Sequence, residues 1–585
     1  MLGNLEFIGA NEVQMRLSDN VNLATNLMNI HVIIEDKDKK ILGEITSIDG
    51  RKVRIALLGE FKDNLFITGV IKKPTLTAQI RFINKEELDM VIGNKTTKSF
   101  LLGDSPLYNG YPIHCDINQM FSNHFAIFGN TGSGKSCGVA RMIQNLFMNK
   151  DVVPVRSNFL IFDAYGEYHN AFERISEINP NFHFKYYTTN TNDTSGELIR
   201  IPVWLLNTND LALFLSASEH SQLPIIDEMI RLANIFASNT DESNAYKNHL
   251  IAKAIISVLY NSETSSSKRN DVFSILDACS TPEFNLETSV QGLGYARSFR
   301  DLFTIDSKGE FPERNLLIEY VTGFINENIE RTVIMTEIQK YGLIELEKAL
   351  NFVLISDGML KNEEVIGSAL ALKVRLHTLV IGEYAKYFEY PEFITKEQYI
   401  NSLVTQNGTK AQIVNFNFED VDDWFAKASI KFYANLIFNH CKSSMGQNIL
   451  PFNILLEEAH RYIQKDNDEY LLGYNIFNRI AKEGRKYGVM MGILSQRPVE
   501  ISETIISQLS NFLIFRMTHP ADVEYIKQML PNISEEIVEK QKSLTAGTCI
   551  AFGKAFRIPQ LVHFQMPNPA PFSSNFDMAT VWHNN

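Results

Sequence analysis

Short runs of alternating apolar and polar residues, separated by turn residues, fill the first hundred positions of the chain. We predict strands at residues 30–35, 41–48, 52–58 and 65–71. Asp49-Gly50, between the second and third of these runs, is a dipeptide typical of hairpin turns. Several short strands in succession are typical of a β domain, and we predict a small β-barrel over residues 1–100.

From Phe125 the pattern changes to apolar runs that are followed by residues with helical spacing. This alternation predicts βα units and a mostly parallel sheet. Phe125–Phe128 and Asn158–Phe162 begin the sheet. Later apolar runs complete it, at residues 412–418, 452–456, 489–494, 511–517 and 548–552. The predicted fold class of this part is therefore α/β.

Between these two groups of strands, apolar residues recur at i, i+3 and i+4, which predicts helices. The predicted helices cover residues 211–215, 225–236, 246–259, 329–350 and 363–379. A Ser/Thr/Asn tract at 261–270 predicts a surface loop. An α/β core that a helical subdomain interrupts is the simplest arrangement. We predict the core at 101–210 and 406–565, the helical insertion at 211–405, and an extended proline-containing arm at 566–585.

Composition restricts the class of protein. A chain of 585 residues exceeds the ~250–300 residues at which single cores stop growing, which predicts several domains. The net charge of −13 argues against a surface covered with DNA-binding charge, but it allows a local basic channel. Five scattered cysteines without a CxxC pair predict neither disulfides nor zinc and fit the reducing cytoplasm. No run approaches the ~18 apolar residues of a membrane span, so no membrane role is predicted.

A glycine-rich segment follows the first core strand. The segment is Gly129-Asn130-Thr131-Gly132-Ser133-Gly134-Lys135-Ser136-Cys137, and it matches the pattern G-x-x-x-x-G-K-[ST] before a helical run. Backbone N–H groups of such a loop converge on phosphates at a helix N-terminus. Lys135 is expected to reach the terminal phosphates and Ser136 to coordinate Mg²⁺. The sequence therefore predicts a binding loop for ATP.

Acidic residues follow two of the predicted strands. Because ligands of open α/β sheets gather at the carboxyl ends of strands, we assign Glu457 to the Mg²⁺ shell and Glu458 to activation of the attacking water. Asp163 and Glu167 follow the strand at 158–162, where a catalytic role and a polar cap on the strand are equally expected. His460, close after the acidic pair, is a further accessory candidate.

Polar residues on either side of the strand at 489–494 complete the candidate site. Gln496, just past this strand, is expected to sense the γ-phosphate. Arg485 lies in a basic segment at the end of a predicted helix, and it is a candidate arginine finger for a neighbour's nucleotide. The alternative for this basic segment is compensation of the helix dipole on a solvated surface.

Taken in order, these motifs resemble the HerA family of hexameric DNA translocases, which are relatives of the FtsK pumps. The matching segments are GNTGSGKS (129–136), the strand with DAYGEY (159–168), LLEEAH (455–460), AKEGRKYG (481–488), SQRP (495–498) and NFLIFRM (511–517). The resemblance implies a RecA-like P-loop ATPase core, and the amino-terminal β domain is similar in pattern and position to that family's small barrel. The family usually has Asp-Glu where this chain has Glu457-Glu458, so the first carboxylate is longer by a methylene group.

The resemblance also implies an assembly. The expected form is a homohexameric ring with ATP sites at subunit interfaces, DNA in the central pore, the helical insertion on the ring's face and the C-terminal arm on the neighbouring subunit. Arg485 and Arg516 are both candidates for a trans-acting or stabilising arginine. The expected partner is a separate effector, a nuclease or a sirtuin-like NADase, in DNA processing or antiphage defence.

The leading interpretation is therefore a ring-shaped, ATP-driven DNA translocase or helicase. One alternative is an oligomeric ATPase scaffold that assembles and regulates a toxic effector with little translocation of its own. A second alternative is an ATPase of the secretion or conjugation type.

Overall fold

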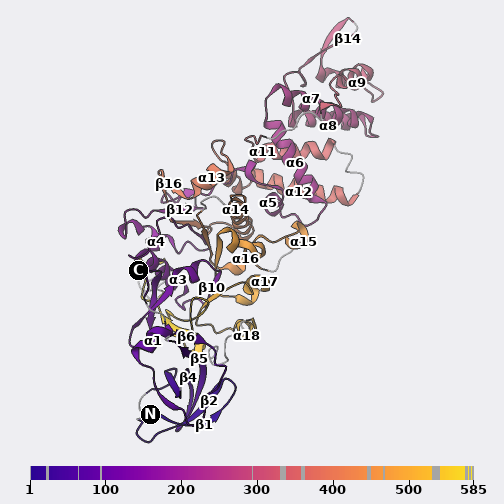
Figure 1. The fold of residues 1–585 in the computed structure, drawn as a ribbon. Helices are drawn as coiled ribbons and strands as arrows, with labels where there is room; N and C mark the ends of the chain where they lie inside the picture. Colours follow the sequence, from indigo (N-terminus) through magenta and orange to yellow (C-terminus); the bar gives the residue numbers. More distant parts are fainter. Residues whose placement is uncertain are drawn as a thin grey trace.

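The structure is a computed structural model. It describes residues 2–21, 26–37, 39–63, 65–92, 95–292, 294–329, 337–356, 363–444, 450–464, 468–529 and 540–572, together with residues 578 and 582. The chain is elongated, with an N-terminal β domain at one end, a large central sheet in the middle and a helical subdomain at the other end (Figure 1).

The N-terminal domain is a curled antiparallel sheet with the strand order β1-β2-β5-β4-β3-β7 and with β6 paired to β5. The strands are β1 (Gly3–Ile8), β2 (Glu12–Leu17), β3 (His31–Asp36), β4 (Lys39–Asp49), β5 (Lys52–Lys62), β6 (Leu65–Thr68) and β7 (Gln79–Phe82). The ends of the sheet approach each other, since Leu2 N donates to Ile80 O at 2.8 Å. The strands predicted between residues 30 and 71 are confirmed, whereas β1, β2 and β7 were not predicted.

The central sheet has the order β13-β12-β18-β11-β19-β20-β10-β21-β22-β23-β8-β9. Its strands are β8 (Ser99–Ser105), β9 (Tyr111–Asp116), β10 (Phe125–Phe128), β11 (Phe159–Asp163), β12 (Phe184–Thr188), β13 (Glu197–Leu198), β18 (Ile413–Asn417), β19 (Phe452–Leu456), β20 (Val489–Ser495), β21 (Asn511–Phe515), β22 (Thr548–Gly553) and β23 (Gln560–His563). The strands from β13 to β21 run parallel, and the pairs from β21 to β9 are antiparallel. The predicted mostly parallel sheet is therefore confirmed, and β8, β9, β12, β13 and β23 are additions to it.

Helices cover both faces of this sheet. They are α1 (Lys85–Ile92), α2 (Ile117–Phe121), α3 (Lys135–Phe147), α4 (His169–Phe172), α14 (Asp423–Ser443), α15 (Asp468–Leu472), α16 (Ile476–Tyr487), α17 (Glu503–Ile506) and α18 (Pro520–Met529), with short 3₁₀ turns η1 (Ile175–Glu177), η2 (Val203–Leu205), η6 (Ala459–Arg461) and η7 (Pro498–Glu500). Ala126 and Phe128 of β10 lie in one apolar core with α14 and α16. Phe125 and Ile127 lie in a second core with α3. A strand buried on both faces explains why β10 is apolar at every position.

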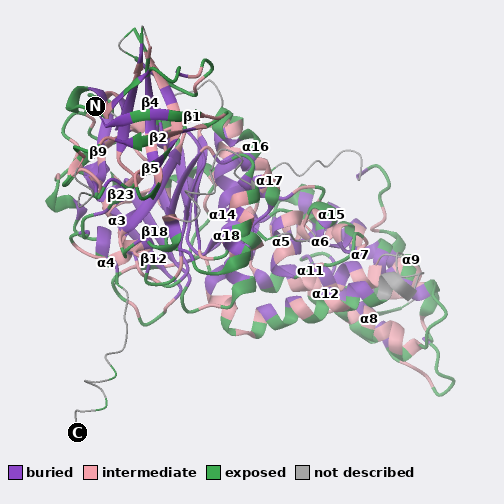
Figure 2. Cartoon of the chain, turned by 90° about the horizontal axis from the view of Figure 1, so that it is seen from below, coloured by how far each residue is buried: buried purple, intermediate pink, exposed green. Residues whose placement is uncertain are grey.

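The helical insertion extends from the side of the central sheet (Figure 2). It contains α5 (Thr208–Phe214), α6 (Gln222–Ala237), α7 (Asp241–Tyr260), α8 (Ser265–Ala278), α9 (Arg314–Thr322), α11 (Leu343–Ser356), α12 (Glu363–Ile381) and α13 (Lys396–Leu403), the 3₁₀ helices η3 (Phe299–Phe303) and η5 (Glu383–Phe388), and the hairpins β14 (Ser289–Gly292) with β15 (Tyr295–Ser298) and β16 (Thr405–Gln406) with β17 (Thr409–Lys410). Among the described residues, no helix is both long and apolar enough to cross a membrane.

Two predictions for the insertion were wrong. The polar tract at 261–270 is a loop only at its start, because the Thr264 side chain accepts a hydrogen bond from Ser267 N at 3.3 Å and so begins α8. Of the helix predicted at 329–350, the described residues that are helical are Ile329 and residues 343–350, and the latter begin α11. The chain just before it is non-helical, and Gly342 N donates to Glu345 Oε2 at 2.8 Å. Residues 330–336 lie outside the described residues.

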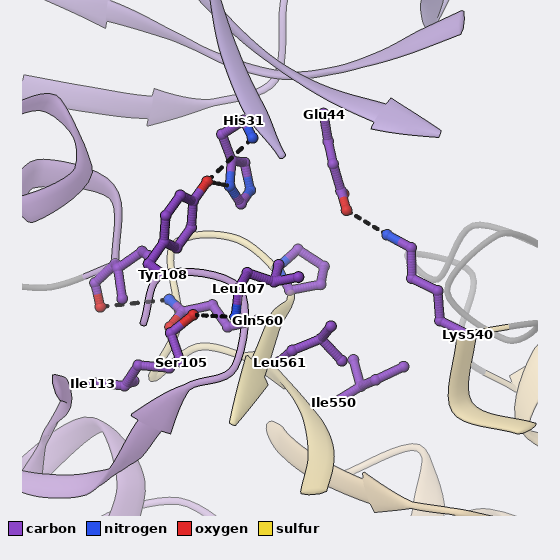
Figure 3. A pocket seen from close by; sticks show the side chains of 12 residues that line it. His31, Glu44, Ser105, Leu107, Tyr108, Ile113, Lys540, Ile550, Gln560 and Leu561 are labelled. Carbon is purple, nitrogen blue, oxygen red and sulfur yellow. Dashed lines mark hydrogen bonds and ion pairs between the residues drawn. The ribbon is translucent and has the colours of Figure 1, made fainter. Parts of the chain in front are cut away.

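The N-terminal sheet is joined to the central sheet by a polar cluster (Figure 3). His31 N donates to Tyr108 Oη at 3.1 Å, and the same hydroxyl lies 2.5 Å from His31 Nδ1. Burial lowers the pKa of His31, so Nδ1 accepts the hydroxyl proton of Tyr108. Beside this pair, Lys540 forms an ion pair with Glu44 of β4. One tyrosine hydroxyl therefore bonds both to the backbone N–H group and to one ring nitrogen of a buried histidine.

We predict that Tyr108→Phe loosens this junction. The substitution keeps the ring but leaves His31 N without its acceptor, so the free energy of unfolding should fall by about 1–2 kcal/mol. Thermal unfolding and limited proteolysis between the two domains measure the effect. Tyr260→Phe, at a tyrosine that is 65% exposed, is the matched control and should leave both unchanged. An unchanged Tyr108→Phe protein would contradict this account of the junction.

Candidate active site

The glycine-rich loop connects β10 to α3 at the carboxyl edge of the parallel strands, as predicted. Gly134 has a φ of 91°, and a Cβ atom there would lie 2.5 Å from the backbone nitrogen of Gly547. Gly547 N in turn donates to Ser133 O at 2.9 Å. The loop therefore has its shape because Gly134 carries no side chain and because a distant glycine supports it.

Both strands that flank β10 hold the loop. Gly129 N donates to Ser495 O at 3.2 Å, and Asn130 N donates to Arg516 O at 3.0 Å. Ser495 ends β20, whereas Arg516 follows β21. Asn130 also donates from its side chain to Thr518 Oγ1 at 2.6 Å. The phosphate-binding loop is thus fixed to the strands on either side of it.

The buried Glu458 carboxylate is at the centre of a polar network that extends to the surface. Lys135 Nζ donates to Glu458 Oε1 at 2.9 Å, and Gln496 Nε2 donates to the same oxygen at 2.5 Å. Thr131 Oγ1 donates to Gln496 Oε1 at 2.6 Å. Strand β19, which precedes Glu458, pairs with β20, which precedes Gln496. The fold thus brings the loop lysine, the acid and the glutamine together.

The charge state of Glu458 follows from its neighbours. Its side chain is only 2% exposed, and burial alone would raise its pKa. Lys135, Gln496 and His460 outweigh burial and hold the pKa of Glu458 below its ordinary value. The carboxylate is therefore ionised. Its backbone has a φ of 45°, the left-handed region that non-glycine residues enter at a cost of roughly 1–3 kcal/mol.

Asp163 closes the loop that follows β11. One of its oxygens accepts from Tyr165 N at 3.3 Å and from Glu167 N at 3.1 Å, and the other accepts from Tyr168 N at 2.9 Å. Asn415 Nδ2 donates to the second oxygen at 3.1 Å. Of the two roles expected for Asp163, these bonds favour the polar cap.

Glu457 and Glu167 lie near Asp163 and face the start of α3. Burial, followed by the charges of Asp163 and Glu167, raises the pKa of Glu457 well above its ordinary value. Burial also raises the pKa of Glu167, although the hydroxyl of Ser136 opposes this. Within the described part of the chain, Glu457 Oε2 and Glu167 Oε2 are buried without a hydrogen-bond partner. These carboxylates therefore repel one another and have unused acceptor atoms.

These residues fit Mg²⁺. The ion takes hard oxygen ligands, keeps several waters, and binds through one or two carboxylates together with substrate phosphates. Ser136 and Glu457 would hold it, with Glu167 beside them. The described residues contain no group of three or more His, Cys, Asp or Glu side chains that could hold a metal ion alone.

The remaining predicted residues lie at the edges of the site. Arg516 is exposed beside the loop, to which its backbone bonds. Cys137 is half-buried in the first turn of α3. Arg485 lies apart, on the exposed face of α16 near His124, whose pKa is lowered to about 4 by burial and then by Arg485. His124 precedes β10 and the loop follows it, so Arg485 is at the opposite end of that strand from its own nucleotide loop.

Sequence reasoning missed several residues of the site. Ser495 Oγ lies 3.1 Å from His460 Nδ1, and it follows an apolar run that gives no sign of a polar contact. Arg461 forms an ion pair with Asp423 and lies over the ring of Tyr165 at 5.4 Å. Arg461 could have been found from the sequence, because it directly follows the acidic motif that ends at His460. Gly547 had none, because it is more than four hundred residues from the loop that it supports.

The fold and the site define a P-loop ATPase of the α/β class. Residues 101–290 match the family model described as "Helicase HerA, central domain". The chain is HerA-like, and the resemblance that the motifs indicate is confirmed.

Relatives with this description include a "DNA double-strand break repair helicase HerA" of Saccharolobus solfataricus, which is 38% identical over 132 residues. That match covers 23% of this chain and 26% of the relative. A protein of the same name from Pyrococcus furiosus is 23% identical over 81% of this chain and 70% of its own length. The "Probable DNA double-strand break repair helicase HerA" of Methanocaldococcus jannaschii is 22% identical over 91% of this chain and 92% of its own.

Solved structures share less with this chain. VirB4 of Thermoanaerobacter pseudethanolicus is 11% identical, with a TM-score of 0.40 over 83% of this chain and 99% of that one. The bacterial conjugative coupling protein TrwB, in complex with a non-hydrolysable GTP analogue, is 11% identical, with a TM-score of 0.42 over 83% of this chain and 93% of its own. Likeness at this level supports no conclusion about function.

We predict that Glu457→Gln stabilises the nucleotide-free protein. In the absence of Mg²⁺, the variant should be more stable than the unaltered protein at pH 8 by about 1 kcal/mol or more, because it removes a carboxyl group whose ionised form is disfavoured by burial and by Asp163 and Glu167. The folded pKa of Glu457 is raised, so ionisation destabilises the fold as pH rises above its ordinary value of 4.5. The stability difference should therefore shrink as pH falls toward that value.

Thermal unfolding at pH 5 and pH 8 without metal or nucleotide measures this difference. Glu177→Gln, at an exposed glutamate, is the matched control and should not change stability at either pH. If Glu457→Gln unfolds at a lower temperature than the unaltered protein at pH 8, then burial beside Asp163 and Glu167 does not destabilise the Glu457 carboxylate.

Proposed function

We propose that the protein hydrolyses ATP at this site and uses the energy to move along or unwind DNA. One observation carries the proposal: Glu458, Gln496 and Lys135 meet in a polar network at the mouth of a phosphate-binding loop. Relatives that match most of the chain have names that describe them as double-strand break repair helicases. We extend that activity to this chain.

The contacts suggest an order of events. Lys135 pairs with Glu458, and on binding ATP it exchanges this partner for the phosphates. The released carboxylate, kept ionised by the remaining contacts, accepts the proton of the attacking water. Ser136 and Glu457 would hold Mg²⁺, which would supply charge that stabilises the transferring phosphate. Gln496, hydrogen-bonded to both Glu458 and Thr131, links the acid to the loop.

We also propose the assembly that the resemblance implies. Six copies close a cytoplasmic ring around DNA, with ATP at the interfaces. The curled N-terminal sheet (1–100) is then a HerA-type barrel, residues 101–210 and 406–565 are the RecA-like core, residues 211–405 are the insertion, and residues 566–585 are the arm. The position of Arg485 supports this part, because this side chain can serve an ATP site only on another subunit.

The last part of the proposal is a separate effector, a nuclease or a sirtuin-like NADase, in DNA processing or antiphage defence. The N-terminal sheet offers a docking surface for it, since Leu65, Ile67 and Ile71 are 64%, 51% and 93% exposed. Co-purification of the chain with the product of a neighbouring gene tests this part.

We predict that Lys135→Ala and Glu458→Gln both abolish hydrolysis, but for different reasons. Lys135→Ala should lose ATP affinity together with activity, since it removes the contact to the phosphates. Glu458→Gln should still bind ATP and should lose about 100-fold or more in turnover, since it removes the proton acceptor. Double-stranded DNA should stimulate the unaltered protein. Phosphate release and fluorescent-nucleotide binding measure these effects, with Lys150→Ala, at an exposed lysine, as the control. Equal hydrolysis with and without DNA, and no strand movement, would contradict the motor.

We predict that Arg485 acts across a subunit interface. Lys135→Ala and Arg485→Ala proteins should each be inactive alone. In a mixed ring, about a quarter of the interfaces combine an intact loop with an intact arginine, so activity should return to that extent.

Mixing Lys135→Ala with Arg516→Ala is the control for this experiment. Arg516 lies beside the loop of its own subunit, so the two belong to the same ATP site. Every site in that mixture therefore lacks either Lys135 or Arg516, and activity should not return. The reverse result, recovery with Arg516→Ala and none with Arg485→Ala, would exclude Arg485 as the trans-acting group.

A further inference from the structure

The second oxygen of Glu458 faces a histidine that the proposed reaction does not yet use. Glu458 Oε2 lies 3.2 Å from His460 Nδ1. Both Lys135 and Gln496 bond to the other oxygen, Oε1. Oε2 itself is buried, and no hydrogen bond to it occurs among the described residues. The imidazole nitrogen is therefore the polar group next to the atom that is free to take a proton.

The proton on this imidazole can be placed from its surroundings. His460 Nδ1 also lies 3.1 Å from Ser495 Oγ, which already accepts from Arg497 N at 2.9 Å. Burial lowers the pKa of His460 although Glu458 opposes this, so the ring is neutral and has one N–H group. A nitrogen lone pair aimed at an ionised carboxylate would repel it. We therefore place the N–H group on Nδ1, 3.2 Å from Glu458 Oε2 and 3.1 Å from Ser495 Oγ.

The backbone holds this arrangement in place. Glu458 has a left-handed φ of 45°, and the chain then turns at once into the short 3₁₀ helix η6, on which His460 lies. Arg461 N donates to Glu458 O at 2.8 Å and closes this turn. Ser495, at the end of β20, is fully buried and fixes the other side of the imidazole. The position of the ring is thus set by two adjacent strands rather than by the loop.

We infer that His460 is a positioning residue that orients the Glu458 carboxylate for attack of water on ATP. This inference rests on the proposed hydrolysis. Once Lys135 binds the phosphates, Glu458 keeps Gln496 at one oxygen and His460 at the other. Without the Nδ1–H group the carboxylate can rotate, and a misplaced base slows the chemical step without weakening nucleotide binding.

The test compares substitutions that differ in where they carry a donor. Asn places its amide near the position of Nδ1, whereas Gln places its amide near that of Nε2. His460→Ala and His460→Gln should lower kcat by about tenfold or more. His460→Asn should keep most of it. The ATP dissociation constant should change by less than about twofold in all of them. His377→Ala, at an exposed histidine of the insertion, is the control.

The outcomes separate this inference from the proposed function. If the unaltered protein binds ATP but never hydrolyses it, with or without DNA, both the proposed function and the role of His460 are wrong. If it hydrolyses ATP and His460→Ala does so equally fast, only the role of His460 falls. The role also falls if His460→Asn is as slow as His460→Ala, or if His460→Ala loses ATP affinity or melts well below the unaltered protein. Slow turnover in the Ala and Gln variants with normal binding, and rescue by Asn, supports it.

Discussion

The structure depends on one buried ion pair, between Lys135 and Glu458. The two side chains are 5% and 2% exposed, and their charged atoms lie 2.9 Å apart. Either charge alone would be costly to bury, so each requires a partner of opposite charge. The sheet order meets this requirement, because β19 and β10 both pair with β20, which places the acid and the loop lysine at the same edge. A change that moved any of these strands would leave a buried charge unpaired.

The local parts of this arrangement could be predicted from the sequence. The strand Phe125–Phe128 was predicted with its bounds as observed, because it is apolar on both faces and the loop begins directly after it. Phe452–Leu456 was predicted for the same reason. Gln496 was placed near Glu458 because the carboxyl ends of parallel strands share one edge of a sheet. Patterns a few residues long were therefore sufficient where the neighbouring structure is itself regular.

Contacts over long distances in the chain could not be predicted. Gly547 supports Gly134, and Tyr108 bonds to His31, but neither pair has a pattern that links its members. The strands β8 and β9 precede the loop in sequence, yet they extend the central sheet on the side of β23. Alternation shows that a segment forms a strand, but not which sheet it joins. Asp163 had two equally expected roles for a related reason: its bonds run to backbone groups whose positions only the folded loop defines.

The two adjacent acids show how the surroundings divide their tasks. Glu457 and Glu458 have the same side chain and are both buried, yet the pKa of one is raised and that of the other is lowered. Glu457 lies among other carboxylates, so it is suited to a place that a cation fills. Glu458 lies among donors, so it stays ionised and ready to accept a proton. Glu457 and Glu458 can serve different tasks because β11 places negative charge beside Glu457, whereas the loop and β20 place hydrogen-bond donors beside Glu458.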